Sequence, residues 1–95
     1  MFAVILSYTR PREEIDLALA AHRDFLTRFY ADGFGIASGR QIGATGGVII
    51  AQAPSRAALE AEIAKDPFKI QGLANYDIYE FEARMVHPAL KGLVG

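Results

Sequence analysis

Apolar residues recur along this chain with two different periods, and the order of these periods predicts the element order β-α-β-β-α-β. Residues 2–8 and 47–52 are apolar on both alternating faces, which is typical of strands buried on both sides. Residues 34–39 form a short segment broken by glycine, and residues 76–85 alternate apolar with charged positions. The last two segments therefore predict strands at the edges of a sheet.

A long helix is predicted between the first two strands. It begins after Pro11, which is tolerated in a first turn, and runs to about Ala31, where Asp32 and Gly33 end it. The expected inner face comprises Ile15, Ala18, Leu19, His22, Leu26, Phe29 and Tyr30, with Phe25 at its border.

A shorter helix is predicted between the third and fourth strands. Ser55 is a suitable N-cap, since its hydroxyl can accept a hydrogen bond from an early helical amide. The helix then runs from about Arg56 to Lys65. Asp66-Pro67 ends it, because the residue before a proline is disfavoured in the helical conformation.

This order of elements predicts a ferredoxin-like α+β fold, a four-stranded antiparallel sheet of order 4-1-3-2 with both helices on one face. The two strands that are apolar on both faces then lie in the centre. The opposite sheet face would expose Phe2, Val4, Val48 and Ile50, or their neighbours. Because such a patch is unfavourable in water, we expect a homodimer whose sheets pack face to face, a dimeric α+β barrel.

Composition narrows the class of protein. The 95 residues suit a single domain, 1–95, in which 86–95 form a C-terminal tail. The net charge of −1 gives no basic surface for nucleic acid or an anionic membrane, and the absence of cysteine excludes disulfides, thiolate metal sites and a cysteine nucleophile. The apolar N-terminus is short and lacks a basic leader, and no apolar run reaches membrane-spanning length. We therefore expect a cytoplasmic protein.

His22 and Asp66 are the candidate chemical groups. His22 lies in the middle of an apolar helix face, where a neutral imidazole could act as a general acid or base or could be an inert core residue. Pro67 alone explains the end of the second helix. A negative charge at a helix C-terminus opposes the helix dipole, so the presence of Asp66 there requires a separate explanation. In a ferredoxin-like fold the end of the second helix can approach the middle of the first, so Asp66 could accept a hydrogen bond from His22.

Three segments resemble the YCII-related (YciI-like) family of small dimeric α+β barrel proteins. They are Ala21-His22-Arg23-Asp24-Phe25-Leu26, Ala37-Ser38-Gly39 and Lys65-Asp66-Pro67-Phe68. The resemblance runs from Phe2 to about Phe81, and Arg40 stands where many members have proline.

The resemblance implies that His22 and Asp66 form the active-site pair. It also implies that Ser38 matches a small polar position near the site, and we assign Ser38 and Phe68 to substrate binding. Some members are linked to lyase chemistry that removes chloride from a hydroxylated, chlorinated aromatic ring. In that chemistry the pair would transfer protons, with the aspartate orienting the imidazole.

Three interpretations of the pair stay open at this stage. It could belong to a lyase-like enzyme that acts on a small organic substrate, to a non-catalytic module that binds a small ligand, or to the core alone. Two ligands are too few for a metal site, and no cofactor loop is present, so we expect neither metal nor cofactor. His87, alone before Pro88, is expected to be solvated or at an interface.

Overall fold

The structure is a computed structural model that describes residues 1–93. Its elements are β1 (Phe2–Tyr8), α1 (Arg12–Ala31), β2 (Gly35–Arg40), β3 (Gly46–Ala51), α2 (Arg56–Ile63), α3 (Pro67–Ile70), β4 (Ala74–Glu80) and the 3₁₀ helix η1 (Pro88–Leu93). The predicted order is confirmed, and the short helix α3 is added between α2 and β4. No helix in this part of the chain is both long enough and apolar enough to span a membrane.

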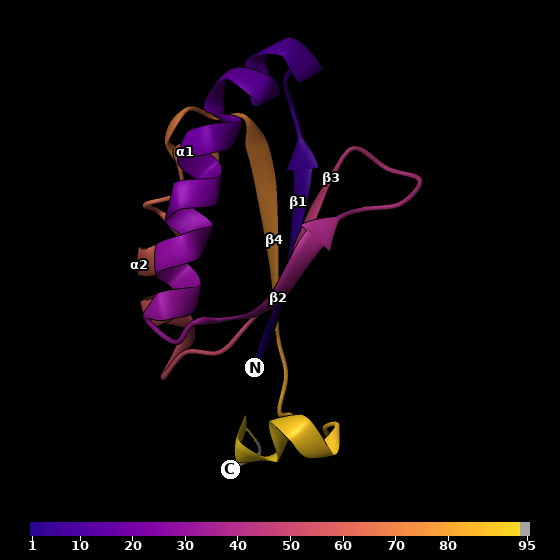
Figure 1. The fold of residues 1–95 in the computed structure, drawn as a ribbon, viewed down its shortest axis with the longest axis vertical. Coiled ribbons are helices and arrows are strands. Elements are labelled where there is room, and N and C mark those ends of the chain that lie inside the picture. Colours follow the sequence, from indigo (N-terminus) through magenta and orange to yellow (C-terminus); the bar gives the residue numbers. More distant parts are fainter. Residues whose placement is uncertain (94–95) are drawn as a thin grey trace.

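The strands form one antiparallel sheet in the order β2-β3-β1-β4, which is the predicted 4-1-3-2 order. The helices α1 and α2 lie together on one side of this sheet, and the segment after β4 leads away from the body of the molecule to η1 (Figure 1). The fold is therefore ferredoxin-like α+β. In this arrangement the two strands that are apolar on both faces, β1 and β3, occupy the centre.

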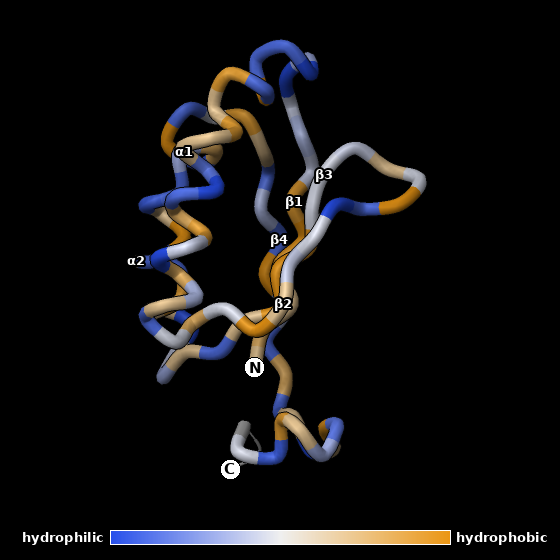
Figure 2. The backbone as a smooth tube through the Cα atoms, viewed as in Figure 1, coloured by the Kyte–Doolittle hydropathy of each residue, from blue (hydrophilic) through white to orange (hydrophobic). Residues whose placement is uncertain are grey.

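The core lies between the sheet and the helices. Its buried residues are Phe2, Val4, Leu6, Ile15, Ala18, Phe25, Phe29, Ile49, Ala51, Leu59, Ile63, Phe68 and Leu73. Figure 2 shows the corresponding hydrophobic colouring in the middle of the sheet and along the inner side of α1. Two predictions for α1 were wrong in detail, because Phe25 belongs to the core whereas Tyr30 is 38% exposed.

The sheet face away from the helices carries the alternate residues of the central strands. Phe2 and Val4 were expected as candidates for this face, but both are buried beneath the helices. Their neighbours Ala3 and Ile5 are only partly buried, and they pair directly with Ile50 and Val48 of β3. Because directly paired residues share a face, these four side chains form a small apolar surface. Tyr79 of β4 extends it, pairing with Ala3 and remaining 60% exposed.

Strand β4 begins earlier and ends sooner than the predicted range of 76–85. Its only neighbour in the sheet is β1, with which it pairs from Ala74 to Glu80. Beyond this range the last backbone bonds join Phe81 to Met1. The strand therefore ends where its partner ends, although the alternating pattern continues to Met85.

Candidate active site

Asp66 does not end α2, which was the sequence-based interpretation. Helix α2 ends at Ile63, and Asp66 is the N-cap of α3, with Pro67 in the first helical position. The carboxylate atom Oδ1 accepts a hydrogen bond of 3.0 Å from the backbone N–H of Phe68. A negative charge at this end of a helix is favourable. The argument that Asp66 opposes a helix dipole was therefore wrong.

The predicted contact between His22 and Asp66 is confirmed. Nδ1 of His22, in the middle of α1, lies 2.8 Å from Oδ1 of Asp66. Asp66 is completely buried, and His22 is 8% exposed. A charge taken out of water at such a depth needs hydrogen-bonding partners. The surroundings of the carboxylate provide them.

Tyr76 of β4 supplies a third hydrogen bond, which the sequence did not predict. Its hydroxyl lies 2.5 Å from Oδ2 of Asp66. Burial, followed by the hydrogen bond and the charge of Asp66, raises the pKa of Tyr76 well above its ordinary range. Tyr76 therefore stays protonated and donates its hydrogen to the carboxylate. The position of Tyr76 at the start of an alternating segment was the available signal, but it carries no information about Asp66.

These donors fix the proton on His22. The ionised carboxylate of Asp66 has no hydrogen to donate, and it accepts from the amide of Phe68 and the hydroxyl of Tyr76. Nδ1 of His22 therefore carries a hydrogen and donates it to Oδ1. Nε2, the other ring nitrogen, is left with a lone pair that can take up a proton. This is the arrangement of a general base held by an acid.

Aromatic rings hold the imidazole in place. The ring of Phe68 is stacked on His22, with centroids 4.0 Å apart and planes 2° apart. The ring of Tyr8, from the end of β1, meets Phe68 edge-on at 5.7 Å. Packing and hydrogen bonding together leave His22 little freedom to rotate, which a catalytic base requires.

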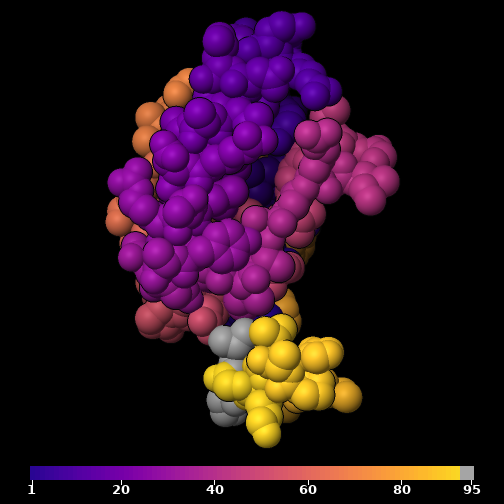
Figure 3. Space-filling view, viewed as in Figure 1, coloured from indigo at the N-terminus to yellow at the C-terminus, as the bar shows by residue number. Residues whose placement is uncertain are grey.

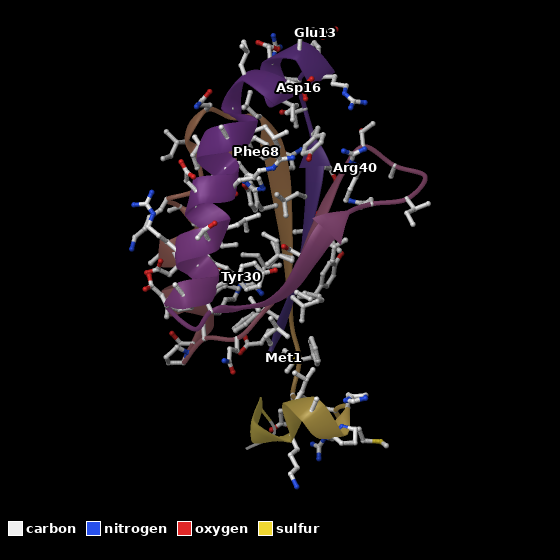
Figure 4. All side chains as sticks on the ribbon, in the orientation of Figure 1. Met1, Glu13, Asp16, Tyr30, Arg40 and Phe68 are labelled. Atoms are coloured by element: carbon white, nitrogen blue, oxygen red, sulfur yellow. The ribbon has the colours of Figure 1, made fainter. Side chains whose placement is uncertain are left out.

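A cavity of about 390 Å³ opens next to this cluster, between the start of α1, the end of β1 and the β2–β3 hairpin. Figure 3 shows a hollow in the surface between α1 and the hairpin. His22 and Asp66 do not line the cavity, but Tyr8 does, and so do Ile15 and Leu19 on the helix face that continues to His22. Figure 4 shows Asp16 near the start of α1, Arg40 near the hairpin, and Phe68 between α1 and β4.

The other proposed residues lie apart from one another. Phe68 stands against His22, whereas the hydroxyl of Ser38 accepts a 2.7 Å hydrogen bond from Tyr30 and, within residues 1–93, bonds to neither His22 nor Asp66. His87 lies in the tail, where Nδ1 accepts from the amide of Ala89. Over the described part of the chain, no three His, Cys, Asp or Glu side chains are grouped to hold a metal ion.

Comparisons with known proteins agree with this fold. A family model for the YCII-related domain matches residues 1–82. Among solved structures, the chain is similar to 5-chloro-2-hydroxyhydroquinone dehydrochlorinase from Burkholderia phenoliruptrix AC1100, in a complex with 2,5-dihydroxybenzoquinone. The sequence identity is 24%, the TM-score is 0.70, and the match covers 85% of this chain and 93% of that chain. A search of curated proteins found no match.

Proposed function

The chain belongs to the YCII-related family, and from this premise we propose that it is a small enzyme whose His22 and Asp66 carry out general acid–base chemistry. One observation carries the proposal. A buried carboxylate, closed by the Phe68 amide and the Tyr76 hydroxyl, accepts a hydrogen bond from Nδ1 of His22. An inert core histidine would need one partner, but it would not need that partner to be oriented by two further donors.

We propose a lyase-type reaction on a hydroxylated aromatic ring. One solved structure similar to this chain is, by its name, a dehydrochlorinase of a chlorinated hydroxyhydroquinone. Such an elimination starts from the keto form of the ring, in which the chlorinated carbon also carries a hydrogen. Nε2 of His22 takes a proton from a substrate hydroxyl, the electron pair of that O–H bond forms a carbonyl group and shifts the ring double bond, and chloride leaves with the electron pair of the carbon–chlorine bond. Asp66 stabilises the imidazolium that forms and keeps the ring oriented. The proton then passes to solvent, which restores the base.

The substrate is proposed to approach His22 from the cavity. Phe68 forms the wall against which the imidazole rests, and Tyr8 joins that wall to the cavity. Ser38 is proposed to contact the substrate from β2, since its hydroxyl is exposed on the strand that ends at Arg40. In this arrangement an aromatic ring would lie between α1 and the sheet.

The alternative is a module that binds a small ligand in the same cavity without converting it. This reading is favoured by the position of His22, which does not itself line the cavity. Turnover separates the two functions. A ligand that binds with measurable affinity and is recovered unchanged, under conditions in which chloride release is followed, would support the binding module.

The experiment uses 5-chloro-2-hydroxyhydroquinone and measures chloride release by the wild type and by His22→Asn. Loss of a general base lowers the rate by roughly 10²–10⁴-fold. His87→Asn is the matched control, because His87 lies in the tail and is expected to leave the rate unchanged. Equal rates for wild type and His22→Asn would contradict the role of His22. Absence of turnover in the wild type would contradict this choice of substrate.

We also propose that two copies form a homodimer through the sheet face that carries Ala3, Ile5, Val48 and Ile50. The support is the apolar character of this surface, which no element of the described chain covers. A cytoplasmic location and the single-domain organisation of residues 1–95 stay predictions from the sequence.

A further inference from the structure

The cavity next to the His22 cluster is lined by three arginines and one acid, Asp16. Arg10 is already paired, since its guanidinium makes contacts of 2.7 and 3.3 Å with the carboxylate of Glu14. Arg12 lies 3.8 Å from Asp16. Arg40 differs from both, because none of the ion pairs or side-chain hydrogen bonds found in residues 1–93 involves its guanidinium. The cavity therefore contains one cation that no carboxylate neutralises.

The sheet register places Arg40 on the same face as the proposed active site. Arg40 pairs with Gly47, Gly47 with Leu6, and Leu6 with Tyr76, so these positions form one row across the four strands. Leu6 is buried under the helices, and Tyr76 at the far end holds Asp66. With neighbouring strands about 4.8 Å apart, the row separates the backbones of Arg40 and Tyr76 by about 14 Å.

The row is open next to Arg40. Gly47 has no side chain, and the adjacent Gly46, which lines the cavity, has φ +158°; a Cβ built there would lie 1.9 Å from the carbonyl oxygen of Leu6. A larger residue at position 46 would therefore have to displace the backbone of β1. The amide of Gln41 lies on the floor between Arg40 and β1, since its Nε2 donates hydrogen bonds of 3.0 and 3.3 Å to the carbonyl oxygens of Leu6 and Gly47. The space for a flat molecule is the cavity itself.

We propose that Arg40 binds an anionic group of the substrate, a carboxylate or a phenolate, while the aromatic ring of the same molecule lies in the cavity. This inference rests on the proposed function only in taking the cavity as the approach to His22. The planar guanidinium binds a carboxylate through two parallel hydrogen bonds, so Arg40 would both select acids and orient the ring. The opposite walls suit an aromatic body, because they are formed by Tyr8, Ile15 and Leu19.

The substrate class that follows is a small aromatic acid or an acidic phenol, with the charged group at the hairpin end and the reacting atoms towards His22. Arg40 is solvent-exposed, so its interaction with an anion is moderated by water and weakens as salt is added. The selection of anions should therefore be clearest at low ionic strength.

The test compares two probes of the same shape, 4-hydroxybenzoate and 4-hydroxybenzamide, which differ in charge at neutral pH. Binding to the full chain is measured by isothermal titration calorimetry at low salt. We expect the wild type to prefer the benzoate by roughly five- to tenfold, and Arg40→Gln to lose that preference while still binding the amide. Arg40→Lys should keep a reduced preference. Arg56→Gln is the charge-matched control, since Arg56 lies on α2 in an ion pair with Glu60 and should bind as the wild type does.

Three outcomes would overturn the inference: no preference for the anion in the wild type, an unchanged preference in Arg40→Gln, or binding of neither probe. The variant His22→Asn separates the test of Arg40 from the test of the proposed function. A preference for the benzoate that survives in His22→Asn supports the role of Arg40, whether or not the wild type shows turnover.

Discussion

The rings of His22 and Phe68 lie face to face, with centroids 4.0 Å apart and planes 2° apart, while the backbone amide of Phe68 binds the carboxylate of Asp66. One residue therefore contacts both members of the pair, the imidazole through its side chain and the acid through its main chain. The geometry of the pair depends on where α3 begins, because the start of that helix sets both contacts of Phe68.

Phe68→Leu separates these two contacts. The variant keeps the amide that binds Asp66 but loses the aromatic stack, so we expect a loss of stability of about 2 kcal/mol and a larger fall in activity than stability alone explains. Urea unfolding and the rate of chloride release measure the two effects. Phe29→Leu is the control, because Phe29 is similarly buried in α1 and makes no stacking contact with His22. Equal activities in the two variants would contradict the orienting role of the stack.

Asp66→Asn should remove the negative charge beside His22 without changing the tautomer of its ring. Because Oδ1 accepts from both the amide of Phe68 and Nδ1 of His22, the oxygen of an asparagine should take this place, and its NH₂ group should face the hydroxyl of Tyr76. The bond from Nδ1–H is then kept, but a neutral amide no longer stabilises the imidazolium that the proposed reaction forms. We expect stability to fall by about 2 kcal/mol and activity to fall by roughly 10²-fold or more.

Nitrogen-15 NMR of the imidazole reports the tautomer directly. The expected result is an Nδ1–H form in both the wild type and Asp66→Asn. Asp32→Asn, at the exposed end of α1, is the control. An Nε2–H form in the wild type would disprove the assigned direction of the hydrogen bond.

Tyr76 makes stability depend on pH in alkaline solution. Its pKa is raised in the folded protein, whereas an unfolded tyrosine ionises near 10.0. Below pH 10 both states are protonated, and the contribution of Tyr76 to stability is complete. Above pH 10 only the unfolded state loses the proton, so the free energy of unfolding falls by up to about 1.4 kcal/mol per pH unit.

Tyr76→Phe should be less stable at pH 7, because Oδ2 of Asp66 loses its donor. The variant should, however, lack the fall in the free energy of unfolding that ionisation of Tyr76 causes above pH 10. Urea unfolding at pH 7, 9 and 11 checks the expectation. Phenolate absorbance offers a second readout, since the difference between wild type and Tyr76→Phe should stay at zero until the wild type unfolds. A difference that develops near pH 10 in folded protein would contradict the burial of this hydroxyl.

Ile50→Lys should convert a dimer into a monomer. Ile50 lies in the apolar surface on the open face of the sheet, opposite Ala3, and a lysine there would place a charge at the centre of the proposed interface. Light scattering at micromolar concentration measures the molar mass. Ile42→Lys, at the fully exposed hairpin, is the control and should leave the mass unchanged. A monomeric wild type would remove the basis for the dimer.

The ferredoxin-like fold could be predicted because its central strands have a clear signature. Residues 2–8 and 47–52 are apolar on both faces, so these segments could be assigned to the centre of the sheet. Strand β1 was predicted with its observed bounds, Phe2–Tyr8. Edge strands were less well predicted. The end of β4 depends on the length of β1, to which it pairs, and the composition of β4 itself does not contain that information.

The candidate site could be predicted only in part. His22 and Asp66 were identified, but the reason given for Asp66 had the wrong sign, since the dipeptide Asp66-Pro67 suits both the end of one helix and the start of another. The contact of Tyr76 with Asp66 and the place of Arg40 in the cavity arise from the register of four strands. A shift of one residue would turn either side chain to the opposite face, so a linear pattern could not assign them.

The place of β1 between β3 and β4 has a consequence for how the protein folds. The first strand of the chain obtains its neighbours only after residues 46–51 and 74–80 are available, so most of the sheet is built from contacts of high sequence separation. Such a topology slows folding, because long loops must close before the pairing of strands can stabilise the structure. His22 and Asp66, 44 residues apart, meet late in that process. A chain emerging from the ribosome therefore cannot complete the contacts of His22, Asp66 and Tyr76 until β4 has been synthesised.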